Sequence, residues 1–463
     1  MFSSSITLPH QVQLLWQKTK NLPSILIVIM LAPIVGVGAG FGAILMEQLV
    51  RFVYHFFFVQ KVFGLLESVG PFYLIIIPAL GGLLVGLIII RFARETYGRN
   101  VPEVLKAVVV HDEKISPQAL MIKSLTSALC AGTGGSVGLG GPTGQLGSAI
   151  GAAVGQWLAL SKEQIRFLFM CGIGAGIAAA FHAPLMGTIF AVEVILGYFS
   201  LGAFSAVLIA AISADMIAQL YKGEFVLVQH YTLVSPWELL LYAVLGVIIA
   251  LSSVGFTKTM AGMKNWWDKL PVSHYLKPML AALLLGTIGF IVFLQTDEFP
   301  RFFGLGMESL SETLNTSLTF HLVLGLFLFK LFATSLTLSS GGSGGTFTPS
   351  FVMGATLGAT FGYLVNLWFP TITAPTAAYA MAGMAAFVVG SMNAPLTALF
   401  IGFEILGGYH IIWPIMVTIL VSTLMMRTMT AKCRTNLGNL WNNSNKRYFP
   451  IKAFRMVWSC KIT

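Results

Sequence analysis

Long apolar stretches decide what this chain can fold into. They lie at residues 24–45, 72–90, 239–254, 278–293 and 411–425. Their length is close to the roughly 20 residues that a helix needs to cross a hydrocarbon core about 30 Å thick. Because 56% of the 463 residues are hydrophobic and only 10% are charged, the composition is also unlike that of a soluble domain. We therefore expect an all-α integral membrane protein that crosses the membrane several times.

The basic residues predict where the two ends of the chain lie. Residues 1–23 are polar and basic and contain no clear signal-peptide cleavage site, while residues 427–463 carry eight Lys or Arg and no Asp or Glu. Since basic segments stay in the cytoplasm beside anionic lipid, both ends are expected there. This topology accounts for the formal net charge of +10, and no nucleic acid is expected as a partner.

Two sets of residues recur at fixed offsets, which indicates a duplicated chain. At an offset of 207, the recurring residues are Lys123, Gly135, Ser136, Pro142, Gly147, Gly151 and Gly155, matched by Lys330, Gly342, Ser343, Pro349, Gly354, Gly358 and Gly362. At an offset of 211, they are Gly172, residues 183–185 and Glu193, matched by Gly383, residues 394–396 and Glu404. We expect a cytoplasmic segment at 1–23, membrane repeats at 24–225 and 226–430, and a basic cytoplasmic tail at 431–463.

Two glycine-rich loops occupy equivalent positions in the halves. They read GGSVGLGGP at residues 134–142 and GGSGGTFTP at residues 341–349, and each ends on a proline suited to the start of a helix. The free amides of such loops can point at an anion, although an alternative is that the glycines only let helices bend and pack. Duplicated transporters commonly hold their substrate between interrupted helices near the bilayer midplane.

Other functional classes find no support in the residues. Neither loop ends in the Lys-Ser or Lys-Thr pair of a nucleotide-binding P-loop. The four cysteines show no CxxC spacing and the eight histidines no HExxH spacing, so we expect no metal, no cofactor and no enzyme activity. A cation pathway would need acidic side chains or carbonyl oxygens at the midplane, whereas these loops offer amides with basic neighbours.

Three motifs, in the same order, resemble those of the CLC family of chloride channels and chloride/proton antiporters. Residues 98–103 (GRNVPE) resemble its Gly-Ser-Gly-Ile-Pro motif, residues 138–142 (GLGGP) its Gly-Arg-Glu-Gly-Pro motif, and residues 344–349 (GGTFTP) its Gly-Gly-Ile-Phe-Ala-Pro motif. The resemblance covers about residues 24–435. It implies the CLC fold, a homodimer in which each subunit has two inverted repeats of tilted and broken transmembrane helices.

The resemblance also implies surroundings and substrate. Membrane lipids, a second copy of the chain and small inorganic anions such as chloride are the expected partners, most simply in the inner membrane of a bacterium. The paired cytoplasmic nucleotide-sensing domains of many relatives are not expected, since only a short basic tail follows the last apolar stretch.

The resemblance further implies which residues meet the anion. Its sites would be lined by the backbone amides of Leu139, Gly140, Gly141, Thr346, Phe347 and Thr348. Neutral amides suit an ion that must also leave. Further pore-lining candidates are Arg99, Asn100, Ser343, Lys123, Lys330 and Thr435. The two lysines either concentrate anions or extend toward an interface, and Arg99 either attracts anions or points into water. Glu193 and Glu404 are expected to have structural or capping roles.

Two positions depart from the proton-coupled members of the family. Gly140 stands in place of the gating glutamate, and Val194 in place of the inner glutamate that transfers protons. Neither residue can carry a proton, so we expect passive, channel-type chloride conduction. One alternative is a chloride/proton antiporter whose path is rebuilt from residues such as Glu103 or His182. Another is a channel for a different small anion such as fluoride. Thr435, finally, stands near the place of a family tyrosine, which predicts a wide inner gate.

Overall fold

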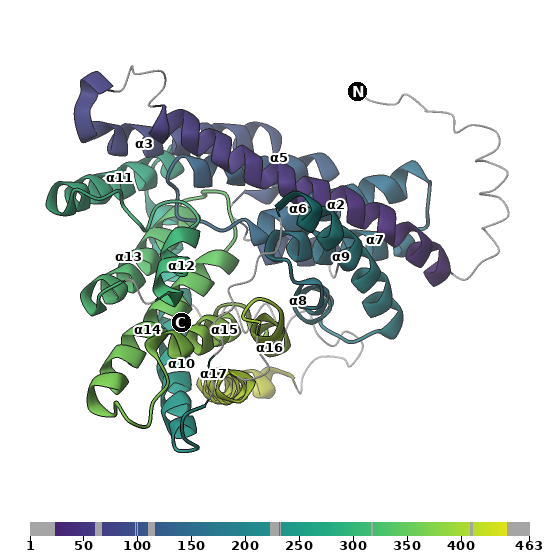
Figure 1. Cartoon of the computed structure of the whole chain (residues 1–463). Coiled ribbons are helices and arrows are strands. Elements are labelled where there is room, and N and C mark those ends of the chain that lie inside the picture. Colours follow the sequence, from purple (N-terminus) through teal and green to yellow (C-terminus); the bar gives the residue numbers. More distant parts are fainter. Residues whose placement is uncertain are drawn as a thin grey trace.

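The computed structural model is almost entirely helical (Figure 1). The structure describes residues 24–60, 67–97, 99, 101–109, 116–222, 231, 233–315, 318–407 and 411–441, and from residue 430 on it describes the backbone alone. Within these ranges the only β-structure is a single antiparallel bridge between Gly138 and Gly345. The predicted segment 1–23, residues 442–463 of the predicted tail 431–463, and the pore candidate Asn100 lie outside the described residues.

The same order of long and short helices occurs twice along the chain. The first set comprises α2 (Ser24–Tyr54), α3 (Tyr73–Phe92), α4 (Val101–Val109), α5 (Pro117–Gly132), α6 (Gly140–Trp157), α7 (Lys162–Phe181), α8 (Pro184–Phe190) and α9 (Leu201–Lys222), with short elements η1 (His55–Val59), η2 (Glu67–Phe72), η3 (Arg94–Thr96) and η4 (Ala191–Leu196). The second comprises α10 (Glu238–Lys269), α11 (Lys277–Thr296), α12 (Met307–Leu314), α13 (Phe320–Ser339), α14 (Phe347–Trp368), α15 (Thr376–Met392), α16 (Pro395–Glu404) and α17 (Ile412–Trp441).

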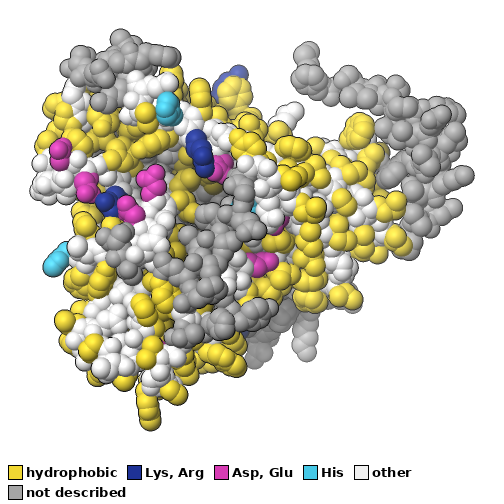
Figure 2. Space-filling model, viewed as in Figure 1, with side chains coloured by type: hydrophobic (Ala, Val, Ile, Leu, Met, Phe, Trp, Pro, Cys, Tyr) yellow, Lys and Arg dark blue, Asp and Glu magenta, His cyan; other side chains and the backbone are white. Residues whose placement is uncertain are grey.

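The surface of these helices suits a lipid environment. In the described part of the chain, nine helical segments are long and apolar enough to cross a membrane. Several of them expose large apolar side chains, such as Phe41 at 59% and Leu294 at 62%, which would be unfavourable in water. Figure 2 shows hydrophobic side chains over most of one face, with the charged side chains gathered in a limited area. The prediction of a multi-pass, all-helical membrane protein is confirmed.

Small residues let the central helices touch backbone to backbone, as their spacing predicts. A Cβ added at Gly147 of α6 would lie 2.1 Å from the carbonyl oxygen of Gly172 in α7. In the second repeat, a Cβ at Gly354 of α14 would lie 2.4 Å from the carbonyl oxygen of Gly383 in α15. Close approach of this kind is how membrane helices gain packing contacts when lipid provides no hydrophobic driving force.

The two repeats interlock across equivalent elements. Helix α3 packs against its counterpart α11, and the short helix α8 packs against its counterpart α16. Several helices stop inside the molecule: α8 and α16 are too short to span a bilayer, and α6 and α14 each begin at the central bridge. Of these helices, α6 and α14 begin at buried residues in the protein interior.

Candidate functional site

The two glycine-rich loops pair with each other at the centre of the molecule. The Gly138 amide donates to the Gly345 carbonyl at 2.8 Å, and the Gly345 amide donates to the Gly138 carbonyl at 2.9 Å. Each loop enters this bridge through a glycine in the left-handed region, Gly134 with φ +98° and Gly341 with φ +101°. An L side chain is strained in that conformation, which explains the glycine at both positions. Because the bridge is antiparallel, the two loops run in opposite directions where they pair.

Hydroxyl contacts between the repeats fix both loops, and they obey the same symmetry. Ser136 Oγ lies 3.0 Å from Thr334 Oγ1 of α13, and the equivalent Ser343 Oγ lies 2.8 Å from Ser127 Oγ of α5. Ser343 Oγ also donates to the Lys123 carbonyl at 2.9 Å. The Ser343 hydroxyl is fully buried and thus holds the loop against α5.

Helices α6 and α14 begin directly beyond the bridge, so their N-termini converge. A Cβ added at Gly138 would lie 2.9 Å from the Thr348 amide nitrogen, and one added at Gly345 would lie 3.2 Å from the Gly141 amide nitrogen. The N-cap residues Leu139 and Thr346 make no side-chain capping bond. First-turn amides have no acceptor within their own helix. Together with the helix dipoles, these two N-termini favour a small anion between them.

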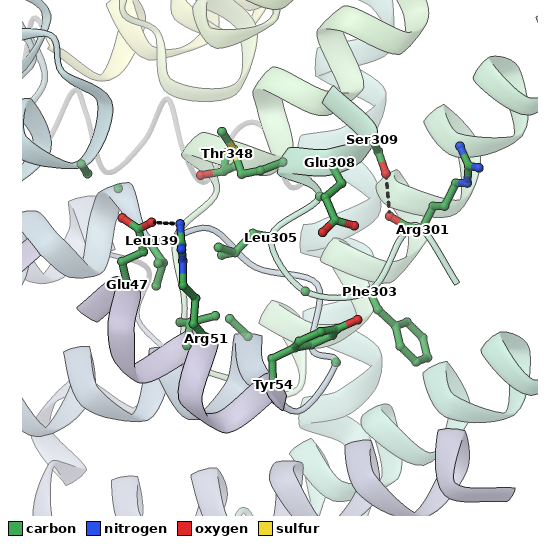
Figure 3. A pocket seen from close by; sticks show the side chains of 18 of the residues that line it. Glu47, Arg51, Tyr54, Leu139, Arg301, Phe303, Leu305, Glu308, Ser309 and Thr348 are labelled. Carbon is green, nitrogen blue, oxygen red and sulfur yellow. Dashed lines mark hydrogen bonds and ion pairs between the residues drawn. The ribbon is translucent and has the colours of Figure 1, made fainter. Parts of the chain in front are cut away.

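A cavity of about 1180 Å³ opens onto one side of this centre. Leu139, Gly140 and Thr348 line it, while the buried Phe347 does not, and neither do Gly141 and Thr346. Figure 3 shows Leu139 and Thr348 across the cavity from the α2 side chain of Tyr54. The cavity therefore connects the surface with part of the predicted amide set.

The charged side chains that line this cavity include more acidic than basic groups. Arg51 pairs with Glu47 at 2.7 Å, and Arg301 pairs with Glu298 at 3.1 Å. Counting the lining residues, four carboxylates (these two, Glu308 and Glu312) face two arginines. In Figure 3 the Glu308 carboxylate points into the open space. The lining side chains therefore supply no excess of positive charge that would attract an anion.

Gly140 and Val194, which stand in place of the two glutamates of proton-coupled family members, bring no titratable group to the site. Gly140 opens α6 at the cavity floor, and Val194 is buried in η4. The described part of the chain contains no group of three or more His, Cys, Asp or Glu side chains placed to hold a metal ion.

On the other side of the bridge lies a far smaller cavity of about 10 Å³. Arg99, Lys123, Tyr97 and the loop glycines Gly341 and Gly344 are among its lining residues. This volume is about that of one water-sized probe. Arg99 thus lies near the second loop, half-buried. The α17 backbone passes through Thr435, whose side chain is not among those described.

The buried lysines neither extend toward an interface nor face the open mouth. The Lys123 ammonium donates to the carbonyls of Thr96 and Arg99, and the Lys330 ammonium donates to the Gly304 carbonyl at 2.9 Å. Both side chains are almost fully buried. Each lysine therefore ties a loop of its own repeat to the helix that precedes the glycine-rich loop, which is a structural role that spacing alone does not reveal.

The repeated glutamates cap helices, as predicted, and each caps a helix of the other repeat. Glu193 accepts from the amides of Leu396 and Thr397 at 2.9 and 2.8 Å, at the start of α16. Glu404 accepts from the amides of Leu185 and Met186 at 2.8 and 2.7 Å, at the start of α8. A carboxylate is favourable at a helix N-terminus, so this exchange fastens the repeats together.

Beside the cavity floor, His182, which the sequence analysis names only for an alternative proton path, is hydrogen-bonded to Asp215, a residue that the sequence reasoning missed. His182 lines the cavity, and its Nδ1 lies 2.9 Å from Oδ1 of Asp215, an almost buried residue of α9. The Gln219 amide donates to the other Asp215 oxygen at 2.8 Å. An aspartate inside the apolar stretch 201–222 is a signal in itself, because acidic groups within membrane helices are costly. Glu103 lies apart from this pair, half-buried on α4.

Comparisons with known proteins agree with this arrangement. The family model described as voltage gated chloride channel matches residues 81–427. The chain is 27% identical over 416 residues to the H(+)/Cl(-) exchange transporter ClcA of Vibrio parahaemolyticus, covering 87% of each chain. It is 25% identical over 366 residues to the voltage-gated ClC-type chloride channel ClcB of Escherichia coli, covering 78% of this chain and 86% of the relative.

Solved structures share the fold. A slow cyanobacterial Cl-/H+ antiporter matches with a TM-score of 0.78 at 24% identity, over 92% of this chain and 99% of the other. A CLC-type fluoride/proton antiporter matches with a TM-score of 0.71 at 24% identity, over 87% and 95%. Since the family model covers well over half of the residues, and the inverted, interrupted helices follow the same fold, the chain belongs to the CLC family of voltage-gated chloride channels and related anion transporters.

Proposed function

We propose that this protein conducts chloride, or a similar small anion, passively through the membrane. The supporting observation is that the N-termini of α6 and α14 meet below an open cavity, while Gly140 and Val194 leave no carboxylate at either position that couples protons in the family. Without a carboxylate at either of these two positions, the anion can move with no obligatory proton exchange.

In this proposal the anion is held by backbone amides rather than by a charged cage. The amides concerned are those of Leu139, Gly140, Gly141, Thr346, Phe347 and Thr348. A helix N-terminus offers about half an elementary charge, which binds an anion weakly enough for rapid release. The pathway requires no cofactor. Arg99, which lines the smaller cavity beside the second glycine-rich loop, would meet the anion as it enters or leaves on that side.

We also propose the assembly and orientation of the chain. The repeats at 24–225 and 226–430 form one subunit of a homodimer in a bacterial inner membrane, with both chain ends in the cytoplasm. A stripe on α9 supports an apolar contact: Ile212, Met216 and Leu220 follow one another at four-residue spacing and are 44%, 62% and 85% exposed.

A second candidate function is chloride/proton exchange by a relocated path. The observation that favours it is the His182–Asp215 pair: His182 lines the cavity together with Gly140, and Asp215 is hydrogen-bonded to His182. Several similar proteins are named as chloride/proton exchangers or antiporters, which points the same way. The transported anion could also be fluoride instead of chloride, since a fluoride/proton antiporter has the same fold.

Coupled measurements of chloride and proton movement separate these candidates. Liposomes loaded with potassium chloride and containing the purified protein are opened to potassium flow, and external chloride and pH are recorded together. Passive conduction predicts chloride efflux with no matching alkalinisation. Stoichiometric proton uptake that disappears in Asp215→Asn would contradict it and support the exchanger. Replacing chloride by fluoride on both sides reports which anion is preferred.

A further inference from the structure

Gly140 has no room for a side chain, because an aromatic ring occupies the space. A Cβ added at Gly140 would lie 2.3 Å from Cε2 and 2.7 Å from Cζ of Phe181. These separations are far inside the van der Waals contact of about 3.5–4.0 Å between carbon atoms. Even alanine at position 140 would require the Phe181 ring to move.

The Phe181 ring is held in this place from two sides. It ends α7 and is followed by His182 in the left-handed conformation (φ 52°), whose own ring is tied to Asp215. On its other side it packs against Phe347 and Phe351 of α14, with ring centroids 5.4 and 5.3 Å away. Since both aromatic partners come from the opposite repeat, the ring bridges the N-terminal ends of α6 and α14.

The ring also forms part of the cavity floor. Phe181 is only 4% exposed, yet it lines the large cavity together with Leu139, Gly140 and Thr348. Its nearest atoms to Gly140 belong to the ring edge, which carries the positive part of the aromatic quadrupole. An uncharged ring whose edge meets the α6 N-terminus narrows the path without repelling an anion, and hydrophobic constrictions are known to gate ion pathways.

We propose that Phe181 is the outer barrier of the anion pathway, filling the space that a side chain at position 140 would otherwise need. Its role in conduction rests on the proposed function, whereas its steric exclusion of a side chain at Gly140 does not. Because the barrier cannot ionise, its resistance to the anion is independent of pH. The side chain tolerated at position 140 then depends on that at position 181: an aromatic ring at position 181 requires a glycine at position 140.

A double-mutant cycle between the two positions tests this inference. Gly140→Ala, Phe181→Ala and the double variant are reconstituted in liposomes for chloride flux, and their thermal unfolding is followed in detergent. Gly140→Ala alone is expected to lower flux roughly tenfold, within the coupling range of residues in contact. Phe181→Ala is expected to raise flux several-fold, and the double variant to recover the flux and the unfolding midpoint of Phe181→Ala.

Matched variants keep the outcome decisive. Phe190→Ala removes another ring that packs on Phe347, at 5.3 Å, so it should show no coupling with Gly140→Ala. Phe181→Leu preserves a fold if alanine does not, and should give an intermediate flux. If the wild type conducts chloride but positions 140 and 181 show no coupling, the proposal that Phe181 is the barrier is refuted and the proposed function is not. Absence of wild-type flux would overturn the proposed function, while coupling in the unfolding midpoints would still support the steric exclusion.

Discussion

Replacing Glu404 by glutamine should destabilise the protein far more than the same change at an exposed helix start. The Glu404 carboxylate accepts two amide hydrogen bonds of α8, at 2.8 and 2.7 Å. Each hydrogen bond to a charged group contributes about 1.5–3 kcal/mol, and the charge at the helix N-terminus adds about 0.3–1 kcal/mol. Glutamine keeps one acceptor oxygen but loses the charge, so we expect a loss of roughly 2–4 kcal/mol in the free energy of unfolding.

Unfolding of the detergent-purified protein by denaturant, followed through intrinsic fluorescence, measures this loss. Glu163→Gln is the matched control, since Glu163 lies in the first turn of α7 but is exposed. Its loss should stay below about 1 kcal/mol. The reciprocal variant Glu193→Gln should resemble Glu404→Gln, because it removes the equivalent cap on α16. Equal effects of Glu404→Gln and Glu163→Gln would refute the view that the exchanged caps fasten the repeats.

Three further predictions concern the loops around the site. Lys330→Met should lower the free energy of unfolding by about 1–3 kcal/mol, since it leaves the half-buried Gly304 carbonyl without its ammonium donor, and denaturant unfolding measures this. Gly341→Ala should lower the free energy of unfolding by about 1–3 kcal/mol, because the backbone at this position has a positive φ. Gly255→Ala should not lower it, because the added Cβ meets open space. Equal unfolding midpoints of the two variants would contradict this. Burial raises the pKa of Tyr97 to about 12, so the folded protein holds this proton more tightly than the unfolded chain. The free energy of unfolding should therefore fall as the pH rises from about 10 to about 12. Thermal midpoints measured across that range should fall less steeply for Tyr97→Phe than for the wild type.

The fold could largely be predicted, because apolar length and the duplicated spacing are properties of the sequence itself. The match of Lys123 with Lys330 and of Glu193 with Glu404 places equivalent helices in both halves, and the resemblance to a family supplies their inversion. A structural or capping role for both glutamates is what the resemblance to the family implies. That each glutamate caps the opposite repeat could not be predicted, because it depends on how the halves dock.

The contacts of the site were harder to predict. Lys123 and Lys330 are basic residues in apolar stretches, and such residues are candidates for a functional site. Their ammonium groups instead donate hydrogen bonds to backbone carbonyls. Gly140 can be identified from the motif, but the ring that fills its space comes from Phe181, 41 positions later and from another helix. Such packing is determined by the tertiary arrangement of helices, and no local periodicity encodes it.

The reversal potential of the purified protein in a planar bilayer tests the central claim most directly. Under a tenfold chloride gradient at equal pH, a chloride-selective passive pathway should reverse at about 59 mV, the value for a monovalent ion at 25 °C. Imposing a second gradient of about two pH units should leave this potential unchanged, since Gly140 and Val194 cannot exchange protons. A reversal potential that moves with the pH gradient would contradict passive conduction and show that proton movement is coupled to that of the anion.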